Sequence, residues 1–312
     1  MITLLYMHSS SLEHDPGPGH PEQPGRIRAI QTMLEREERK GGLVGIVRRE
    51  PERATVEQLE RVHTARYVER ILGAIPNEGH VRLDADTVVS PGSGEAALRT
   101  AGAALGAVDA VIRGGARRAF CALRPPGHHA EPERAMGFCL FNNVALAAMQ
   151  ALEVHGLERV SIFDFDVHHG NGTQAAFARE GRVQYLSTHQ WPLYPGTGAE
   201  HETGVGNIVN RPLPAGTGSK AWRRVVERDI LPAITAHDPD LVLVSAGFDA
   251  HRDDPLAMLE LVEDDFFWVT RELCGIADRH ARGRLVSVLE GGYNLNALAA
   301  SAFAHLDALV HP

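Results

Sequence analysis

The feature that most constrains the fold is the alternation of short apolar runs with helical patterns along the whole chain. The apolar runs have strand length, and those in the middle of the chain are apolar nearly throughout. Strands of this kind are covered on both faces, which is typical of parallel sheets flanked by helices. The expected strands span residues 2–7, 44–48, 118–123, 159–165, 182–188, 207–209, 241–246 and 285–289. The pattern predicts an α/β fold with about eight mostly parallel strands and helices on both faces.

Helical patterns with recognisable beginnings lie between these strands. Asn142 or Asn143, Ser219 and Asp264 stand where three of them start. Side chains of this type accept hydrogen bonds from the first free N–H groups of a helix, so we expect N-caps there. The chain has 312 residues, which would allow two domains, but it shows no repeat and no low-complexity linker. We therefore expect one domain over residues 1–312, as α/β folds of this size often form.

Four long segments rich in glycine, proline and histidine interrupt this pattern. They cover residues 8–23, 124–141, 189–218 and 247–263. Long loops in a compact domain are often functional. They follow predicted strands, so they should meet at the carboxyl edge of the sheet, where open α/β folds bind ligands.

Charge and cysteine content limit the classes of function. The chain has 31 lysines and arginines against 40 acidic residues, a net charge of −9, which argues against binding to nucleic acid. No stretch is long and apolar enough to span a membrane. Three cysteines (Cys121, Cys139 and Cys274) form no Cys-x-x-Cys pair, which favours free thiols and a cytoplasmic protein. Homo-oligomers are common among soluble enzymes, so a homo-oligomer is an expected alternative to a monomer.

One strand end carries an unusual set of polar groups. In an extended segment alternate side chains share a face, so Asp164, Asp166 and His168 should point the same way. Burying such groups without partners is costly, and a divalent metal ion is one suitable partner. The structural alternative is a strand end whose polar groups meet water and loop amides.

Three further motifs follow three other predicted strands. They are Arg124-Pro-Pro-Gly-His128-His129, Ser245-Ala-Gly-Phe-Asp249 and Gly291-Gly-Tyr293. Each taken alone has a structural explanation, as a tolerated histidine pair, a turn aspartate or a packed tyrosine. Together they suit metal-assisted hydrolysis, because two carboxylates and one imidazole leave a coordination position for water. A histidine then removes the proton of that water, and a tyrosine hydroxyl stabilises the developing oxyanion.

In this order and spacing, the motifs resemble those of the zinc-dependent histone deacetylase superfamily, with the acetylpolyamine amidohydrolases and acetoin-utilisation proteins. The likeness covers nearly the whole chain and points to the class II branch, in which asparagine stands at position 171. It implies an arginase/deacetylase-like fold and one catalytic domain. It rests on His20-Pro-Glu-x-Pro24, the Arg124–Ala130 motif, Gly137-Phe-Cys139, Phe141-Asn-Asn143, Asp164-x-Asp-x-His-His-Gly-Asn-Gly172, Tyr194-Pro-Gly-Thr-Gly198, Ser245–Asp249 and Gly291–Tyr293.

The resemblance implies roles at the reaction centre. Asp166, His168 and Asp249 would hold the zinc ion, and the same ligands also accept Fe²⁺. His129 would be the general base that activates the zinc-bound water, and then the acid for the leaving amine. Tyr293 would polarise the acetyl carbonyl.

The resemblance also implies supporting roles. His128, paired with Asp164, would tune the electrostatics, and Asn171 would orient His129. Asp164 and Ser187 would belong to a structural K⁺ site, largely through backbone oxygens. Six residues match positions that line the acyl-lysine tunnel, its rim or an internal channel: Gly137, Phe138, Tyr194, Asp86, Arg26 and Leu256.

The activity implied is removal of acetyl, or a similar short acyl group, from a lysine side chain of a peptide or protein. An acetylpolyamine amidohydrolase acting on an acetylated small amine is the main alternative. Leu256 stands where polyamine-selective relatives carry a glutamate, and residues 76–87 leave no room for a large insertion. A non-catalytic acyl-lysine binding module and a manganese ureohydrolase are further alternatives that the tyrosine and the histidine pair disfavour.

Overall fold

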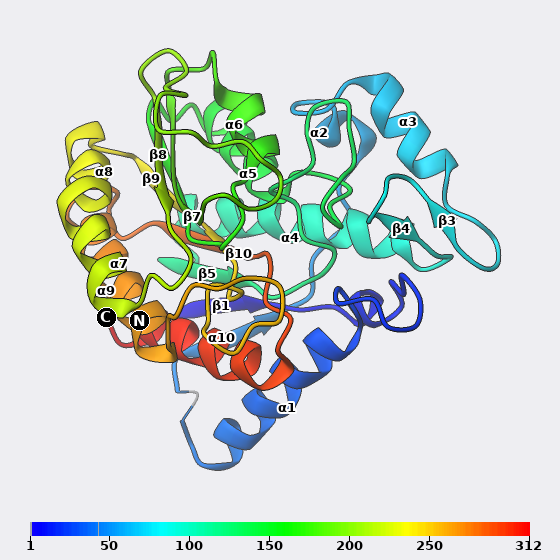
Figure 1. Ribbon diagram of the computed structural model, residues 1–312, viewed down its shortest axis with the longest axis horizontal. Coiled ribbons are helices and arrows are strands. Elements are labelled where there is room, and N and C mark those ends of the chain that lie inside the picture. The colour runs from blue at the N-terminus through cyan, green and yellow to red at the C-terminus, as the bar shows by residue number, and fades with distance from the viewer. Residues whose placement is uncertain (1, 43) are drawn as a thin grey trace.

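The computed structural model describes residues 2–42 and 44–312, and a sheet of eight strands forms its centre (Figure 1). The strand order is β2-β1-β5-β10-β9-β6-β7-β8. Every neighbouring pair in this sheet runs parallel, which confirms the predicted α/β class. The strands are β1 (Thr3–Tyr6), β2 (Ile46–Arg49), β5 (Arg118–Cys121), β6 (Val160–Asp164), β7 (Val183–Gln190), β8 (Ile208–Leu213), β9 (Leu241–Ala246) and β10 (Leu285–Leu289).

Helices cover both faces of the sheet, as the pattern predicts. Helices α1, α9 and α10 pack with α7 and α8 on one face, and α4, α5 and α6 pack on the other. Helices α2 and α3 build a smaller apolar cluster against α4. The helices are α1 (Gly25–Arg39), α2 (Val56–Leu59), α3 (Ala65–Gly73), α4 (Ser93–Ile112), α5 (Asn143–Met149), α6 (Asn171–Phe177), α7 (Ser219–Val225), α8 (Leu231–His237), α9 (Glu263–His280) and α10 (Leu295–Val310).

The two faces of each strand explain how the sequence builds these two layers. Successive side chains of a strand point to opposite sides. Leu5 and Phe163 pack in the cluster with α1 and α10, whereas their neighbours Leu4 and Ile162 pack in the cluster with α4 and α5. Such strands need apolar residues at nearly every position, which is the pattern of the sequence.

Two of the predicted N-caps are wrong. Asn142 does cap α5, because its side chain accepts the N–H of Ala145. Gly218 rather than Ser219 precedes α7, and the Ser219 hydroxyl donates to Asp265 at 2.6 Å instead. Helix α9 begins at Glu263, so Asp264 lies inside its first turn. The carboxylates of this first turn interact favourably with the positive end of the helix dipole.

A small antiparallel hairpin lies apart from the main sheet. It joins β3 (Val81–Arg82) to β4 (Val88–Val89). Strands of two residues carry no readable period, and the sequence pattern does not predict them. The hairpin stands beside α3, close to one end of α4 (Figure 1).

The carboxyl edge of the main sheet is where the polar motifs gather. Strands β6, β9 and β10 are neighbours, and each is followed at once by one of the predicted site motifs. Strand β5, next to β10, leads into the segment with the histidine pair. The topology therefore brings four separate parts of the sequence to one edge.

None of the helices in the described ranges combines the length and apolar character that crossing a membrane requires.

Candidate active site

Three buried side chains offer ligand atoms to one point at this edge. One ligand atom from each of Asp166, His168 and Asp249 lies within 4.8 Å of the others. His168 Nδ1 is 3.1 Å from Asp166 Oδ1 and 3.1 Å from Asp249 Oδ2. The structure thus brings together all three residues predicted as metal ligands. In the described part of the chain no other group of His, Cys, Asp and Glu meets this criterion.

Backbone contacts fix the two carboxylates. The Gly291 N–H donates to Asp166 Oδ2 at 2.8 Å, and the Val167 N–H donates to Asp249 Oδ1 at 2.9 Å. A β-carbon at Gly291 would overlap both carboxylates, and one at Gly247 would overlap Asp166. The glycines of two of the sequence motifs are therefore required by close approach of backbone to the ligands.

The two adjacent histidines have different partners. His128 Nδ1 lies 3.0 Å from Asp164 Oδ2, and His129 Nδ1 lies 2.8 Å from Asn171 Oδ1. Asn171 in turn donates to Glu131 at 2.7 Å, which fixes its amide with the oxygen toward His129. His129 therefore holds a proton on Nδ1 and presents Nε2 as a free base.

The surroundings shift the pKa values of the two imidazoles in opposite directions. Burial, together with positive charge on His128 and His168, lowers the pKa of His129 well below its usual value. Burial also disfavours charge on His128, but the Asp164 and Asp166 carboxylates outweigh it and raise the pKa of His128 well above its usual value. This difference suits a neutral base beside a charged imidazole.

Tyr293 faces the same site from the segment after β10. Burial raises the pKa of its phenol well above the usual value, so the hydroxyl keeps its proton and can donate it in a hydrogen bond. The Arg26 guanidinium carbon lies 5.0 Å from the centre of the tyrosine ring. Arg26 is fully buried and donates to the carbonyl of Gly292 at 2.7 Å. Arg26 is therefore a buried neighbour of Tyr293, and its place in an internal channel stays a prediction.

A narrow cavity of about 200 Å³ opens onto these groups. Five of its lining residues were predicted for the tunnel or rim, and Leu193 is an addition. Tyr194 packs edge-on against His129, with ring centres 5.2 Å apart. Phe138 packs edge-on against Tyr293 at 5.8 Å. The lining is Asp86, His129, Gly137, Phe138, His168, Leu193, Tyr194, Leu256 and Tyr293.

The rim residues hold defined positions at the mouth of this cavity. The Asp86 carboxylate accepts the Gly137 N–H at 3.0 Å and the Thr87 hydroxyl at 2.9 Å. Leu256 is 36% exposed and Tyr194 is 38% exposed, so both offer apolar surface to solvent at the entrance.

The predicted potassium residues lie on neighbouring strands. Asp164 of β6 pairs in register with Ser187 of β7. The Asp164 carboxylate is occupied by His128 and by the Tyr185 hydroxyl at 3.0 Å. The Ser187 hydroxyl is within 2.9 Å of His189 Nδ1. Both side chains are thus engaged within the protein, and potassium binding by these residues stays a prediction.

Two buried acids beside the site are absent from the sequence prediction. Glu290 accepts the N–H groups of Gly127 at 2.6 Å and His128 at 3.0 Å. Asp254 accepts the Tyr293 N–H at 2.7 Å. Glu290 stands directly before the Gly-Gly-Tyr motif, and an acid at the end of a buried strand is the signal that could have marked it.

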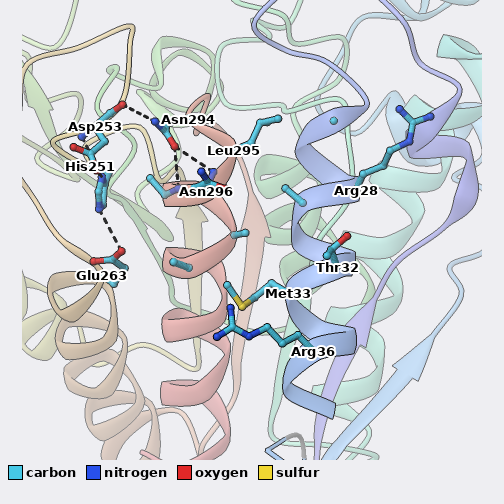
Figure 2. A pocket seen from close by; sticks show the side chains of 15 residues that line it. Arg28, Thr32, Met33, Arg36, His251, Asp253, Glu263, Asn294, Leu295 and Asn296 are labelled. Atoms are coloured by element: carbon cyan, nitrogen blue, oxygen red, sulfur yellow. Dashed lines mark hydrogen bonds and ion pairs between the residues drawn. The ribbon is translucent and has the colours of Figure 1, made fainter. Parts of the chain in front are cut away.

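A larger hollow of about 810 Å³ lies elsewhere, between α1, α10 and the segment after β9 (Figure 2). Met33 and Arg36 extend from α1 toward α10, and His251 faces Glu263 at 3.6 Å (Figure 2). None of the predicted site residues lines it. The smaller cavity is therefore the candidate active site, because metal-competent and titratable groups converge there.

Comparison with known proteins agrees with this geometry. Residues 20–309 match the histone deacetylase domain. The chain is 39% identical to a probable deacetylase of Archaeoglobus fulgidus over 325 aligned positions, covering 100% of this chain and 89% of that protein. It is 43% identical to the histone deacetylase-like amidohydrolase of Pseudomonas aeruginosa, covering 88% of this chain and 73% of that protein.

A solved structure gives the same result in three dimensions. The crystal structure of the HDA15 HD domain superposes with a TM-score of 0.93 at 34% sequence identity. The match covers 99% of this chain and 88% of that one. The predicted arginase/deacetylase-like architecture is thereby confirmed. With its domain match, its relatives and its fold in agreement, the chain belongs to the histone deacetylase family.

Proposed function

We propose that this protein is a zinc-dependent deacetylase that removes acetyl, or a similar short acyl group, from lysine side chains. The observation that carries the proposal is the position of His129 and Tyr293 in one narrow cavity with the metal-competent His168. A long, thin amide substrate could place its carbonyl between these groups. The family membership supports deacetylase activity, and the site supplies the residues for it.

The residues present suit a resident divalent metal. Two buried carboxylates face one imidazole, and their ligand atoms lie within 4.8 Å of one another. Buried carboxylates of this kind need a positive partner, and two glycines leave the space in which they can approach. Asp166, His168 and Asp249 would hold the ion. When bound, the ion supplies Lewis acidity toward water and the amide carbonyl.

The proton transfers fall to the protein. His129 removes a proton from the attacking water through Nε2 and then delivers it to the leaving amine. Asn171 holds the ring for both steps through the 2.8 Å contact at Nδ1. The Tyr293 hydroxyl donates a hydrogen bond to the carbonyl oxygen as negative charge develops there. A free amine and a carboxylate leave the site.

Asp164 and Ser187 would take part in a structural K⁺ site through backbone oxygens. A hard cation there would offset the charge of the carboxylates beside it. Three free and buried cysteines agree with a reducing, cytoplasmic location. The net charge of −9 favours a protein or small-amine substrate over nucleic acid.

An acetylpolyamine amidohydrolase is the second candidate. Polyamine selectivity needs an acid at the mouth to bind the distal ammonium group. Asp86 is the carboxylate that lines the cavity, and two hydrogen bonds already engage it. Leu256 lines the same cavity with an apolar side chain. These observations favour acyl-lysine.

The test compares turnover of an acetyl-lysine peptide and N-acetylputrescine by the metal-loaded protein. A Tyr293→Phe variant is the control for chemistry at this site. We expect a higher kcat/KM for the peptide and loss of at least about a hundredfold in the variant. Faster turnover of N-acetylputrescine would contradict the proposal of acetyl-lysine and indicate an acetylated polyamine as the substrate. Peptide binding without turnover would favour the non-catalytic module.

A further inference from the structure

A chain of hollows leads away from the cavity mouth, and arginines line it. The first hollow, about 620 Å³, shares Asp86 and Phe138 with the cavity and also contacts Arg82. The second, about 540 Å³, contains Arg82 again, together with Arg70 and Arg134. A substrate whose acyl-lysine occupies the cavity would pass over this surface with its neighbouring residues.

Two of these guanidinium groups are fixed without neutralising their charge. Arg70 of α3 donates to the backbone carbonyl of Glu133 at 2.7 Å and lies over the Tyr67 ring at 5.3 Å. Arg82 of the β3–β4 hairpin donates to the backbone carbonyl of Ala85. Among residues 2–42 and 44–312, no carboxylate forms an ion pair with either one. Each guanidinium group thus has a backbone carbonyl as its partner, and its charge remains available at the surface.

Positive side chains outnumber negative ones around the second hollow, where three arginines stand against two acidic residues. Arg134 pairs with Asp84 at 3.0 Å, so those two charges largely offset each other. The exposed Glu133 carboxylate is the other acid of the lining. Arg66 stands one helical turn from Arg70 and lines the adjoining hollow with it. Two arginines at this spacing repel each other, and Glu133, which also lines that hollow, is one carboxylate against the two.

This excess of positive charge is opposite in sign to the protein as a whole, which carries −9. Arginine recognises carboxylates through paired N–H donors. Resting on the proposed function, we infer that this surface is a subsite for an acidic residue flanking the acyl-lysine of a peptide or protein substrate. A free polyamine, which is cationic, would be repelled by the same surface.

The experiment uses matched acetyl-lysine peptides with the metal-loaded full chain. Glutamate, glutamine or lysine is placed in turn at each of the positions up to three residues from the acetyl-lysine, and kcat/KM is measured. At the position that reaches Arg82 we expect glutamate to exceed glutamine by about 1.5- to fivefold, the range of exposed ion pairs. Raising the salt from about 0.1 M to about 1 M should remove most of this preference, because the screening length falls to about 3 Å.

Variants assign the preference to the surface. Arg82→Gln and Arg70→Gln should each reduce the ratio of glutamate to glutamine peptides, while Arg82→Lys should keep part of it. Arg113→Gln, at an exposed arginine just after α4, is the matched control and should leave the ratio unchanged. Equal kcat/KM for the glutamate and glutamine peptides at every position would overturn the subsite, as would a preference that survives both variants.

A binding measurement separates the test of the subsite from the test of the proposed deacetylase activity. The same peptides are titrated against the Tyr293→Phe protein by calorimetry, which requires no turnover. Hydrolysis without charge preference rejects the subsite alone. Binding that favours glutamate, with no peptide hydrolysed by the wild type, supports the subsite and rejects the deacetylase. Binding that ignores the charge also rejects the subsite.

Discussion

The Asp254 carboxylate links the backbone of Tyr293 to that of Leu256, and both of these residues line the cavity. Its Oδ2 accepts the backbone N–H of Tyr293 at 2.7 Å, and its Oδ1 accepts that of Leu256 at 3.0 Å. The Asn294 N–H, 3.3 Å from Oδ2, is a third donor. Asp254 is only 7% exposed, so water does not replace these contacts easily. One side chain therefore sets the spacing between two walls of the cavity.

Replacing Asp254 should reduce turnover more than substrate affinity. Asp254→Ala leaves buried N–H groups without an acceptor, at roughly 1–3 kcal/mol for each unpaired group. The Tyr293 hydroxyl is then less well placed for the transition state, and we expect kcat to fall by about ten- to a hundredfold. Asp254→Asn keeps one carbonyl oxygen and should retain intermediate activity. Steady-state kinetics and thermal unfolding of both variants measure the two effects.

The adjacent Asp253 provides the control. Its side chain is 62% exposed and lies 3.9 Å from His251, outside hydrogen-bond distance. Asp253→Asn should leave both kcat and the unfolding temperature nearly unchanged. A loss of kcat in Asp253→Asn equal to that in Asp254→Asn would show that charge near the mouth matters rather than the backbone contacts.

Asn171 should control the rate through His129. Asn171→Ala removes the 2.8 Å contact that holds Nδ1, so the base loses its orientation and its fixed tautomer. We expect kcat to fall about ten- to a hundredfold with a smaller change in KM, since Asn171 does not line the cavity. Kinetics on the acetyl-lysine peptide check this expectation.

A surface asparagine separates this effect from a general loss of amide groups. Asn296 lies exposed in the first turn of α10, and Asn296→Ala should leave kcat unchanged. If Asn171→Ala raised KM and spared kcat, Asn171 would act on substrate binding and the orienting role would be wrong.

Removing the metal should affect both activity and stability. A chelator should abolish turnover, and resupply of Zn²⁺ should restore it. An ion that binds only the folded state at a hundred times its Kd adds about 2.7 kcal/mol, which corresponds to roughly 5 °C in Tm. Asp166→Asn should lose this metal-dependent Tm shift, because one ligand is missing. Reconstitution with Fe²⁺ under nitrogen compares the two candidate ions, and a chelated protein that stays fully active would reject the metal site.

The parts of the fold that the sequence predicts are those with a repeated local signal. Strands such as β9 and β10 are apolar at nearly every position, and their predicted bounds are the observed ones. Because parallel strands share their carboxyl edge, the motifs that follow them must meet there. The sequence alone therefore predicts that Asp249, which follows β9, lies near Asp166, which follows β6.

Contacts that depend on loop conformation could not be predicted in this way. Asp254 lies in an irregular segment, and its partner Tyr293 is 39 residues away. The β3–β4 hairpin has two residues in each strand, too few to show a period. Arg70 and Arg82 come from separate elements, and only the folded chain places them in one hollow. The spacing of such residues along the sequence does not show that they lie close together in the folded chain.

Buried His63 couples stability to pH. Its Nε2 accepts the Asn142 N–H at 2.9 Å and its Nδ1 donates to the Glu131 carbonyl at 3.1 Å, so the folded chain holds the neutral ring. Burial lowers the pKa of His63 from 6.5 to about 4. The unfolded chain therefore takes up a proton first as the pH falls. The stability from His63 is complete above about pH 6.5 and is lost as the pH drops toward 4.

Denaturant unfolding at several pH values tests this coupling. Between pH 6.5 and 4 the protonation of His63 should lower the free energy of unfolding by up to about 3 kcal/mol. This value follows from about 1.4 kcal/mol for each unit of the pKa difference between the unfolded and folded states. In His63→Gln the amide oxygen can still accept the Asn142 N–H but nothing titrates. The variant should therefore lose less stability than the wild type between pH 6.5 and 4. His201→Gln, at an exposed histidine, should keep the wild-type slope. Parallel curves for wild type and His63→Gln would mean that other buried groups carry the whole dependence.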